Sequence, residues 1–362
     1  MNILVINTVD FKLNGISSVI MNYYRSMDKN NMKVDFVAIN EIDKSYKDDI
    51  DSNNSRVYYI PRKGNPARYI QELFKLLKNN QYDIVHIHGN SSTMAIETVI
   101  AYVTKIPVRI IHSHNTTCKH QIVHKILYPV LKATYTHGFA CGEEAGKWLF
   151  RKNRFEVIKN GINLDNFKYD NKIRVTYREK INAKDKKVIV NVGNFVYQKN
   201  HEFLINTFSK LIKKNSEYLL LLIGEGDLLE QMKTLVKELE ISESVIFLGK
   251  TTEVSNYLQA ADIFALTSHF EGVPVVLIEA QALGLPCMVS NKVSQEANLT
   301  DLIEFLPIDD SKLWIESICD KSFDKRKEVS FKSHKDISKK GYDVSLNANE
   351  MKKKYEQYLK GY

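Results

Sequence analysis

The chain contains the stretch Ser268-His269-Phe270-Glu271-Gly272-Val273-Pro274-Val275-Val276-Leu277-Ile278-Glu279-Ala280, directly after an apolar run from Ile263 to Leu266. The apolar run predicts a buried strand, and Pro274 predicts the first turn of a helix, where a missing N–H costs nothing. The backbone N–H groups of 272–276 are then expected to be unpaired at a helix N-terminus, which favours phosphate. Glu271 and Glu279 flank that place, so we expect them to hold neutral hydroxyl groups. A capped surface helix with two solvated acids is the alternative.

Short apolar runs alternate with helical patterns on both sides of this stretch. Strands are predicted at 2–7, 33–39, 56–60, 83–88, 108–112, 188–192, 218–223, 245–248, 263–266 and 286–290, and helices near 16–27, 65–78, 202–213 and 228–239. This alternation predicts two parallel, doubly wound α/β sheets, in which ligands bind at the carboxyl ends of the strands. The polar segment 160–187 is predicted to connect the two halves.

Size and composition are those of a globular protein with two domains. The chain has 362 residues, of which 44% are apolar and 26% charged, and no apolar run reaches the roughly 20 residues that span a bilayer. The first residues resemble a strand rather than a leader, so we expect a cytoplasmic location. Cys118, Cys141, Cys287 and Cys319 are scattered, which indicates neither a zinc site nor a disulfide framework.

Positive charge is concentrated in the first half of the chain. The net charge is +8, and residues 1–170 contain 23 Lys and Arg against 16 Asp and Glu. Such an excess favours an anionic partner, with the inner face of the cell membrane as one candidate; no motif supports nucleic acid. The segment 119–132 is a basic amphipathic helix, for which we consider two interpretations: a membrane-surface helix and a domain-packing helix. Both hold if its apolar residues pack inward while Lys119, Lys125 and Lys132 meet lipid headgroups.

The spacing of Glu271 and Glu279 resembles the E-x7-E signature of retaining nucleotide-sugar glycosyltransferases of family 4, especially those of bacterial exopolysaccharide and capsule synthesis. The likeness continues through Glu279-Ala280-Gln281-Ala282-Leu283-Gly284-Leu285-Pro286. It implies a GT-B fold, with two Rossmann-like domains facing a central cleft and a C-terminal helix crossing back to the first domain. The implied parts are an acceptor-binding domain over 1–165, a nucleotide-sugar-binding domain over 166–340 and the helix over 341–362.

The resemblance implies roles for the residues of this stretch and of the turn after the strand 188–192. Glu271 would contact the transferred sugar and Glu279 the ribose, while the loop of Gly272, Val273 and Pro274 would hold the diphosphate. Lys199 matches a lysine that neutralises the diphosphate, but Asn194 stands where the family has an arginine. A lost charge-assisted contact of roughly 1.5–3 kcal/mol would slow transfer unless another cation compensates, which is the outcome we favour.

Other strand ends carry weaker signals. Gly224 lies in a turn for which two interpretations stand: it shapes the nucleotide site, or it is only a tight turn between a strand and a helix. The sequence of this turn lacks the third glycine of a dehydrogenase fingerprint. Gly15 resembles a glycine near the donor phosphates, preceded by Asn14, which tolerates a positive φ. A lone histidine is more often structural, but three at neighbouring strand ends favour a site. By the resemblance, His114 faces the donor sugar, and we assign His88 and His112 to acceptor binding, His112 in a supporting role.

These observations predict a retaining glycosyltransferase that moves a hexosyl or N-acetylhexosaminyl group from a nucleotide diphosphate, UDP in the first instance. The expected acceptor is a growing saccharide or one linked to polyprenyl diphosphate. Because no D-x-D pair follows a strand, we expect no metal and no other cofactor. The alternatives are a nucleotide-sugar epimerase of the same fold and a non-catalytic protein that binds polysaccharide or membrane.

Overall fold

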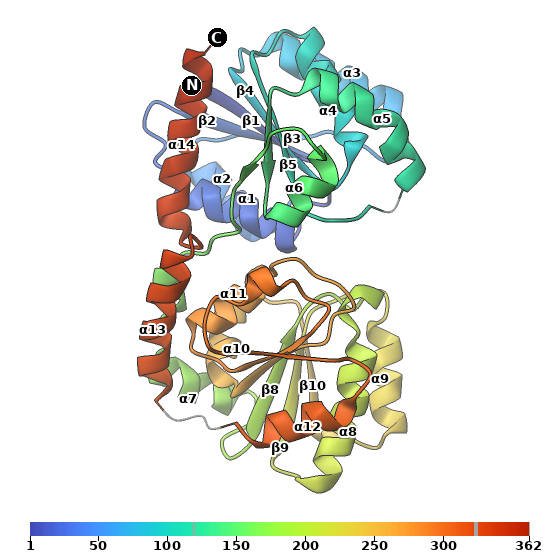
Figure 1. The fold of residues 1–362 in the computed structure, drawn as a ribbon, viewed down its shortest axis with the longest axis vertical. Coiled ribbons are helices and arrows are strands. Elements are labelled where there is room, and N and C mark those ends of the chain that lie inside the picture. Colours follow the sequence, from blue (N-terminus) through green and yellow to red (C-terminus); the bar gives the residue numbers. More distant parts are fainter. Residues whose placement is uncertain (119, 322–324, 362) are drawn as a thin grey trace. The chain divides into compact units, whose positions relative to one another are not determined.

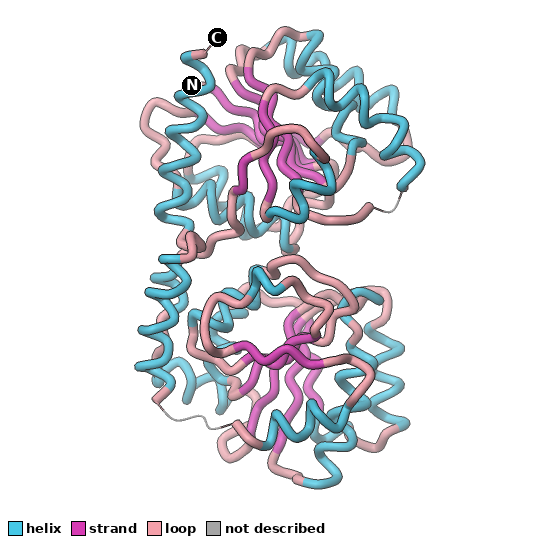
Figure 2. Tube along the Cα trace, in the orientation of Figure 1, coloured by secondary structure: helices cyan, strands magenta, loops and turns pink. Residues whose placement is uncertain are grey.

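Each half of the chain folds around its own parallel β-sheet, and the two sheets define two structural units (Figures 1 and 2). The structure is a computed structural model, which describes residues 1–118, 120–321 and 325–361. Unit 1 comprises Met1–Ile162 and Gly341–Tyr362, and unit 2 comprises Asn163–Lys340. The C-terminal segment therefore belongs to the same unit as the first strand.

Unit 1 is built on a seven-stranded sheet in the order β3-β2-β1-β4-β5-β6-β7. Its strands are β1 (Asn2–Asn7), β2 (Lys33–Ala38), β3 (Val57–Tyr59), β4 (Ile84–Gly89), β5 (Val108–Ser113), β6 (His137–Ala140) and β7 (Glu156–Val157). Its helices are α1 (Gly15–Ser26), α2 (Lys44–Ser52), α3 (Pro66–Asn79), α4 (Ala95–Val103), α5 (Gln121–Thr134), α6 (Glu143–Phe150) and α14 (Val344–Lys360). All neighbouring strands are parallel, as the alternating sequence pattern predicts.

The two faces of this sheet are covered by different helices. Because successive side chains of a strand point to opposite faces, Leu4 and Ile6 join the core formed with α3, α4 and α6. Ile3 and Val5 face the other way, toward α1 and α14. On α14 the buried residues Val344, Ala348, Met351 and Tyr355 recur at helical spacing, and this apolar stripe packs beside α1 (Figure 1).

Unit 2 repeats this design with six strands in the order β10-β9-β8-β11-β12-β13. The strands are β8 (Lys187–Val192), β9 (Tyr218–Ile223), β10 (Val245–Gly249), β11 (Ile263–Leu266), β12 (Cys287–Ser290) and β13 (Ile303–Leu306). The helices are α7 (Asn171–Lys180), α8 (His201–Lys214), α9 (Leu229–Glu238), α10 (Val254–Ala260), α11 (Val275–Ala282), α12 (Ser311–Cys319) and α13 (Arg326–Lys339). In both units the first strand of the unit lies beside the fourth, where the direction of winding reverses.

The two units join at Ile162 and Asn163, within the predicted connection 160–187 and three residues before the predicted boundary at 165, but the rest of the segment is not a plain connection. It contains α7, which packs on α10 inside unit 2. Arg174 and Arg178 of α7 both bind Asp262, at 2.5 Å and 3.0 Å. These arginines carry the polar character that suggested a linker, but they are largely shielded from solvent and join the helix to the start of β11.

Helix α5 also differs from the expected inward packing of its apolar residues. Ile122 is 75% exposed and Ile126 67% exposed. The face that packs inward carries His124, Leu131 and Thr134 instead. An apolar stripe therefore faces away from the core of unit 1. None of the helices in the described part of the chain has the length and apolarity needed to cross a membrane.

Candidate functional site

The strand order of unit 2 brings together the two loops that the sequence singled out. Because β8 and β11 are neighbours, the loop after β8 and the loop after β11 leave the same edge of the sheet side by side. Lys199 comes from the first loop and Glu271 from the second. The Lys199 Nζ and Glu271 Oε1 atoms lie 2.6 Å apart, and the two side chains are only 16% and 13% exposed. This is the place where open α/β sheets bind ligands.

Hydrogen bonds between the two loops hold this pair in place. Thr267 Oγ1 donates to the carbonyl of Asn200 at 3.0 Å. Gln198 Nε2 donates to the carbonyl of Phe270 at 3.0 Å, and the Gln198 carbonyl in turn accepts from the His269 N–H at 2.8 Å. Sequence reasoning missed Thr267 and Gln198 as supporting residues. The only signal in the sequence was their polarity shortly after predicted strands.

Gly224 packs the loop after β9 against the loop after β8. Its φ is +150°, a conformation that side chains rarely adopt, and a Cβ atom there would lie 2.1 Å from the carbonyl oxygen of Gly193. Next to it, Phe195 N–H donates to the carbonyl of Glu225 at 2.8 Å. The geometry of Gly224 is therefore that of a close backbone crossing beneath the candidate site.

The start of α11 leaves backbone donors free beside Glu271. Pro274 is the residue that precedes the helix, with φ −67° and ψ 131°, rather than part of its first turn. Within the described residues, nothing accepts a hydrogen bond from the N–H groups of Gly272, Val273, Val275 and Val276. Such unpaired donors at a helix N-terminus form an anion-binding position.

Glu279 lies on α11 and differs chemically from Glu271. Its carboxyl group has no hydrogen bond or ion pair among the described residues. Burial of this carboxyl raises its pKa to about 7, because no cation offsets the loss of water. The side chain is nevertheless partly accessible. A desolvated carboxylate without a partner can accept hydrogen bonds from hydroxyl groups of a ligand.

The remaining polar residues of these loops have different surroundings. Asn194 is exposed, and its amide has no partner in the described part of the chain. His201 is buried and stacks on Phe195 with 4.1 Å between ring centroids. Asn200 adopts the left-handed conformation and caps α8 by accepting from the Phe203 N–H at 3.4 Å. Sequence analysis did not identify this cap.

Asn14 and Gly15 start the corresponding helix of unit 1. Asn14 has φ −147°, so the tolerance of asparagine for a positive φ is not used at this position. Its side chain caps α1 by accepting from the Ser17 N–H at 3.1 Å. Gly15 has free space around its Cα, with nothing within 4 Å of a Cβ atom built there. The opening to a ligand that the sequence suggested for Gly15 is thus sterically available.

Four histidines of unit 1 form one cluster on β4, on β5 and directly after β5. His88 and His112 are neighbours in the strand register, and His86 joins them although sequence analysis had not selected it. His88 Nδ1 lies 2.9 Å from His114 Nε2. His112 has no exposed surface and His88 only 4%, whereas His114 is partly exposed. As the cluster stands, only His114 offers substantial surface to a ligand.

Burial keeps these imidazoles neutral. It lowers the pKa values of His86 and His114 to about 3, and those of His88 and His112 well below the ordinary value. For all except His114, repulsion between neighbouring histidines adds to the effect. The cluster therefore offers lone pairs and N–H groups rather than positive charge.

Comparison with known families gives two matches that together cover most of the chain. The model for "Glycosyl transferases group 1" matches residues 174–301, and the model for "Glycosyltransferase Family 4" matches residues 13–166. The first contains Lys199, Glu271 and Glu279, and the second contains the histidine cluster. The matches and the fold of each unit define the class: a glycosyltransferase with the GT-B fold.

Individual relatives agree with this class. The chain is 29% identical to the Bacillus subtilis (strain 168) protein "Putative glycosyltransferase EpsF" over 352 residues, covering 92% of this chain and 91% of that protein. It is 26% identical to the "UDP-Gal:alpha-D-GlcNAc-diphosphoundecaprenol alpha-1,3-galactosyltransferase" of Escherichia coli, with 60% of each chain covered. The fold resembles Anabaena Alr3699/HepE, solved in complex with UDP and glucose, with a TM-score of 0.81, 14% identity and coverage of 99% and 100%.

The particular family follows from the two matches. The chain belongs to the group 1/family 4 glycosyltransferases, which are enzymes that transfer sugars.

Proposed function

We propose that the chain transfers a sugar from a UDP-linked donor to a saccharide acceptor in exopolysaccharide or capsule synthesis. The observation that carries the proposal is the Lys199–Glu271 pair, set beside the free N–H groups at the start of α11. A cation and several backbone donors suit a diphosphate, while an adjacent carboxylate suits the hydroxyls of the sugar attached to it. The bound UDP and glucose of Alr3699/HepE support a donor of this kind.

In the proposed mechanism, Lys199 turns from Glu271 to the diphosphate when the donor binds. The bond between the anomeric carbon and the diphosphate oxygen breaks, and negative charge develops on the leaving group. Lys199 and the N–H groups of Gly272 and Val273 stabilise that charge, which is the largest contribution expected from fixed donors in a site shielded from water. Glu271, released from the ion pair, accepts hydrogen bonds from the sugar hydroxyls.

For the acceptor half of the reaction we propose front-face attack with retention of configuration. The acceptor oxygen forms its bond to the anomeric carbon, and its proton passes to an oxygen of the leaving phosphate. No metal takes part at the diphosphate in this scheme. His114, which is partly exposed, is the residue of the histidine cluster that we assign to the donor sugar. His88 and His112 are too buried to touch a saccharide directly, so their proposed part in acceptor binding is to position His114.

Glu279 is proposed to hold the ribose of the donor. Its partnerless carboxylate can accept from both ribose hydroxyls, and a bound nucleoside would supply the hydrogen bonds that the free protein does not provide. Gly15 is proposed to lie near the donor phosphates, and Asn194 to donate one neutral hydrogen bond to them. A single amide does not replace the missing arginine charge, so Lys199 and the helix N-terminus carry the neutralisation.

The proposed acceptor is linked to a polyprenyl diphosphate and is met at the inner face of the cell membrane. The relative from Escherichia coli, whose name contains a diphosphoundecaprenol-linked sugar, supports a lipid-linked acceptor. Helix α5 supports attachment to the membrane, because its apolar residues Ile122 and Ile126 are exposed next to Lys125 and Lys132. Lys119, which the sequence also suggested for this contact, lies outside the described residues.

The test is release of UDP from a UDP-linked sugar with and without a polyprenyl-diphosphate-linked saccharide. We expect acceptor-dependent release by the wild type and a loss of about 100-fold or more in Glu271→Ala. Glu230→Ala is the matched control, because it breaks another Lys–Glu contact, with Lys233 at 2.7 Å, on the exposed face of α9.

Two results would replace the proposal by its alternatives. If no nucleotide sugar releases UDP with either the wild type or Glu271→Ala, the chain is a non-catalytic binding protein. If a radiolabelled donor gives only small products without an acceptor, the chain is an epimerase. A preceding thermal-shift screen with nucleotide sugars selects the donor, because a ligand that binds only the folded state raises its melting temperature.

A further inference from the structure

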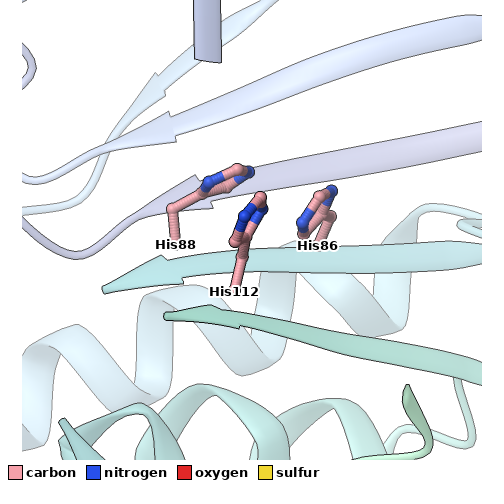
Figure 3. A group of neighbouring side chains, drawn as sticks. All are labelled: His86, His88 and His112. Carbon is pink, nitrogen blue, oxygen red and sulfur yellow. The ribbon is translucent and has the colours of Figure 1, made fainter. Parts of the chain in front are cut away.

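Three buried histidines of unit 1 converge on one side of the sheet (Figure 3). His86 and His88 are two residues apart on β4, so their side chains point to the same face. His112 lies directly opposite His88 on β5 and points to that face as well. One ring nitrogen from each residue can be chosen so that all three lie within 4.8 Å of one another.

Three ring nitrogens of these histidines are not satisfied by the described residues. Within the described part of the chain, His86 Nε2 and both ring nitrogens of His112 are buried and have no hydrogen-bond partner. Buried polar atoms are rarely left in this state, and a group of them indicates a missing water, ion or ligand. Neutral imidazole nitrogens are the protein ligands that zinc, copper, nickel and cobalt ions share.

A hydrogen-bond relay from α14 orients His86 for such a role. Tyr355 Oη lies 2.7 Å from His86 Nδ1 and 3.1 Å from Met351 Sδ. When its proton goes to the sulfur, the tyrosine oxygen accepts from His86 Nδ1, and this is the arrangement that metal binding through Nε2 requires. With its proton on Nδ1, the neutral ring has a lone pair on the unpartnered Nε2. A second partner that fixes the tautomer in this way is the common arrangement around metal-binding histidines.

His88 has a corresponding partner in His114. The two rings share one proton between His88 Nδ1 and His114 Nε2 at 2.9 Å. When His88 is the donor, its other nitrogen has a free lone pair. His114 would then accept the hydrogen bond that fixes the tautomer of His88, as Tyr355 does for His86.

The rings border a small cavity beneath α1 and α14. It measures about 30 Å³ and is lined on the helix side by Val19, Tyr23 and Met351. This volume is enough for about two waters by the criterion of one water per 10–15 Å³. An ion bound by the three rings would thus have room for a water as a fourth ligand.

We propose that His86, His88 and His112 bind a divalent transition-metal ion, for which Zn²⁺ is the best match, with a cavity water as the fourth ligand. Three histidines and one water give the tetrahedral coordination that zinc prefers. The ion would join β4 to β5 and, through Tyr355, secure α14 against the sheet. It would be structural and lies in a different unit from Lys199, so it takes no part in neutralising the diphosphate. The expectation of no metal rested on the absence of a D-x-D pair and does not address this cluster.

The first test measures metal in the untagged wild-type chain. The protein is stripped with a chelator, dialysed, and titrated with ZnCl₂ alone or CoCl₂ alone. We expect one equivalent to bind, to raise the melting temperature, and with cobalt to give the intense visible absorption of a tetrahedral site. If the stripped chain takes up no stoichiometric zinc and its melting temperature does not respond, the cluster holds only water and the proposal is overturned.

Matched variants locate the ion. His112→Gln should lose the bound zinc, whereas His201→Gln should keep it, because His201 is an equally buried, partly unpartnered histidine in unit 2. Tyr355→Phe removes a single hydroxyl and should weaken zinc binding by about 10- to 100-fold. It keeps the test valid if His112→Gln does not fold. A folded His112→Gln that still binds one zinc, or a Tyr355→Phe with wild-type affinity, would contradict the site as described.

Discussion

The two units share a strand order but carry different chemistry near the point where the winding reverses. In unit 1, β4 at the winding reversal carries His86 and His88, and the next strand, β5, carries His112 and leads into His114; all four imidazoles are neutral and most are buried. In unit 2 the corresponding loops carry an ion pair, Lys199–Glu271, and free backbone donors. The first helix after the first strand of each unit even starts with the same device, an asparagine cap, at Asn14 and Asn200.

This difference shows what the fold contributes and what the side chains contribute. The doubly wound order places the first and fourth strand ends of each unit together, whatever residues they carry. Whether the result suits a diphosphate or a metal ion depends on a few side chains and on their access to water. Three substitutions test this distinction, from the largest expected effect to the smallest.

The largest effect is expected from Gly224→Ala. The added methyl group would meet the Gly193 carbonyl at 2.1 Å, so one of the two loops of unit 2 must move. We expect a loss of about 3 kcal/mol or more in the free energy of unfolding, measured by urea denaturation. Gly15→Ala at the start of α1 is the comparison, because it meets nothing within 4 Å and should change stability by less than about 1 kcal/mol. If Gly224→Ala and Gly15→Ala lower the free energy of unfolding equally, the close approach of Gly224 to Gly193 does not add to the stability of unit 2.

An intermediate effect is expected from Lys199→Met, which keeps most of the length of the side chain but removes its charge. UDP affinity and kcat/KM should each fall by about 10- to 100-fold, as for the loss of one charge-assisted contact. Lys233→Met is the control, because Lys233 also pairs with a glutamate but on an exposed helix face. Calorimetry with UDP and initial rates provide the measurements. If both variants bind UDP like the wild type, the charge of unit 2 does not serve the diphosphate.

The smallest effect is expected from Glu279→Gln, and its sign depends on pH. The pKa of Glu279 in the folded protein is about 7, above the ordinary value of 4.5. Between pH 4.5 and 7 the carboxyl group therefore keeps its proton in the folded protein but has lost it in the unfolded chain. Stability should therefore fall as pH rises from 4.5 to 7. Removing the carboxyl should raise the free energy of unfolding at pH 8 by about 1 kcal/mol, because the side chain is partly accessible, and should leave it unchanged near pH 4.

The same variant should also bind UDP more weakly, because an amide offers the ribose one acceptor in place of two. Denaturation curves at the two pH values, together with UDP titrations, give both quantities. If the Glu279→Gln variant is less stable than the wild type at pH 8, or binds UDP as tightly, the basis for assigning Glu279 to a ligand is removed.

The sequence predicted the strands well where side chains are buried on both faces. The predicted ranges 2–7, 218–223 and 263–266 are those of β1, β9 and β11, since continuous apolar runs leave few alternatives. Helix α7 was missed because its stability comes from Arg174 and Arg178 binding Asp262, more than 80 residues away along the chain. A polar pattern alone cannot distinguish a linker from a helix held by such long-range pairs.

By itself, the sequence determined the alternating α/β pattern, the E-x7-E stretch with its two acids, and the lysine that matches the family. Only the tertiary structure decided that Lys199 pairs with Glu271, that Glu279 has no partner among the described residues, and that His86 joins His88 and His112 in one buried cluster. The physical reason is that local patterns follow from side-chain size and polarity within a few residues. Ion pairs, desolvation and ligand clusters depend instead on which strands become neighbours, and that is settled only when the whole sheet forms.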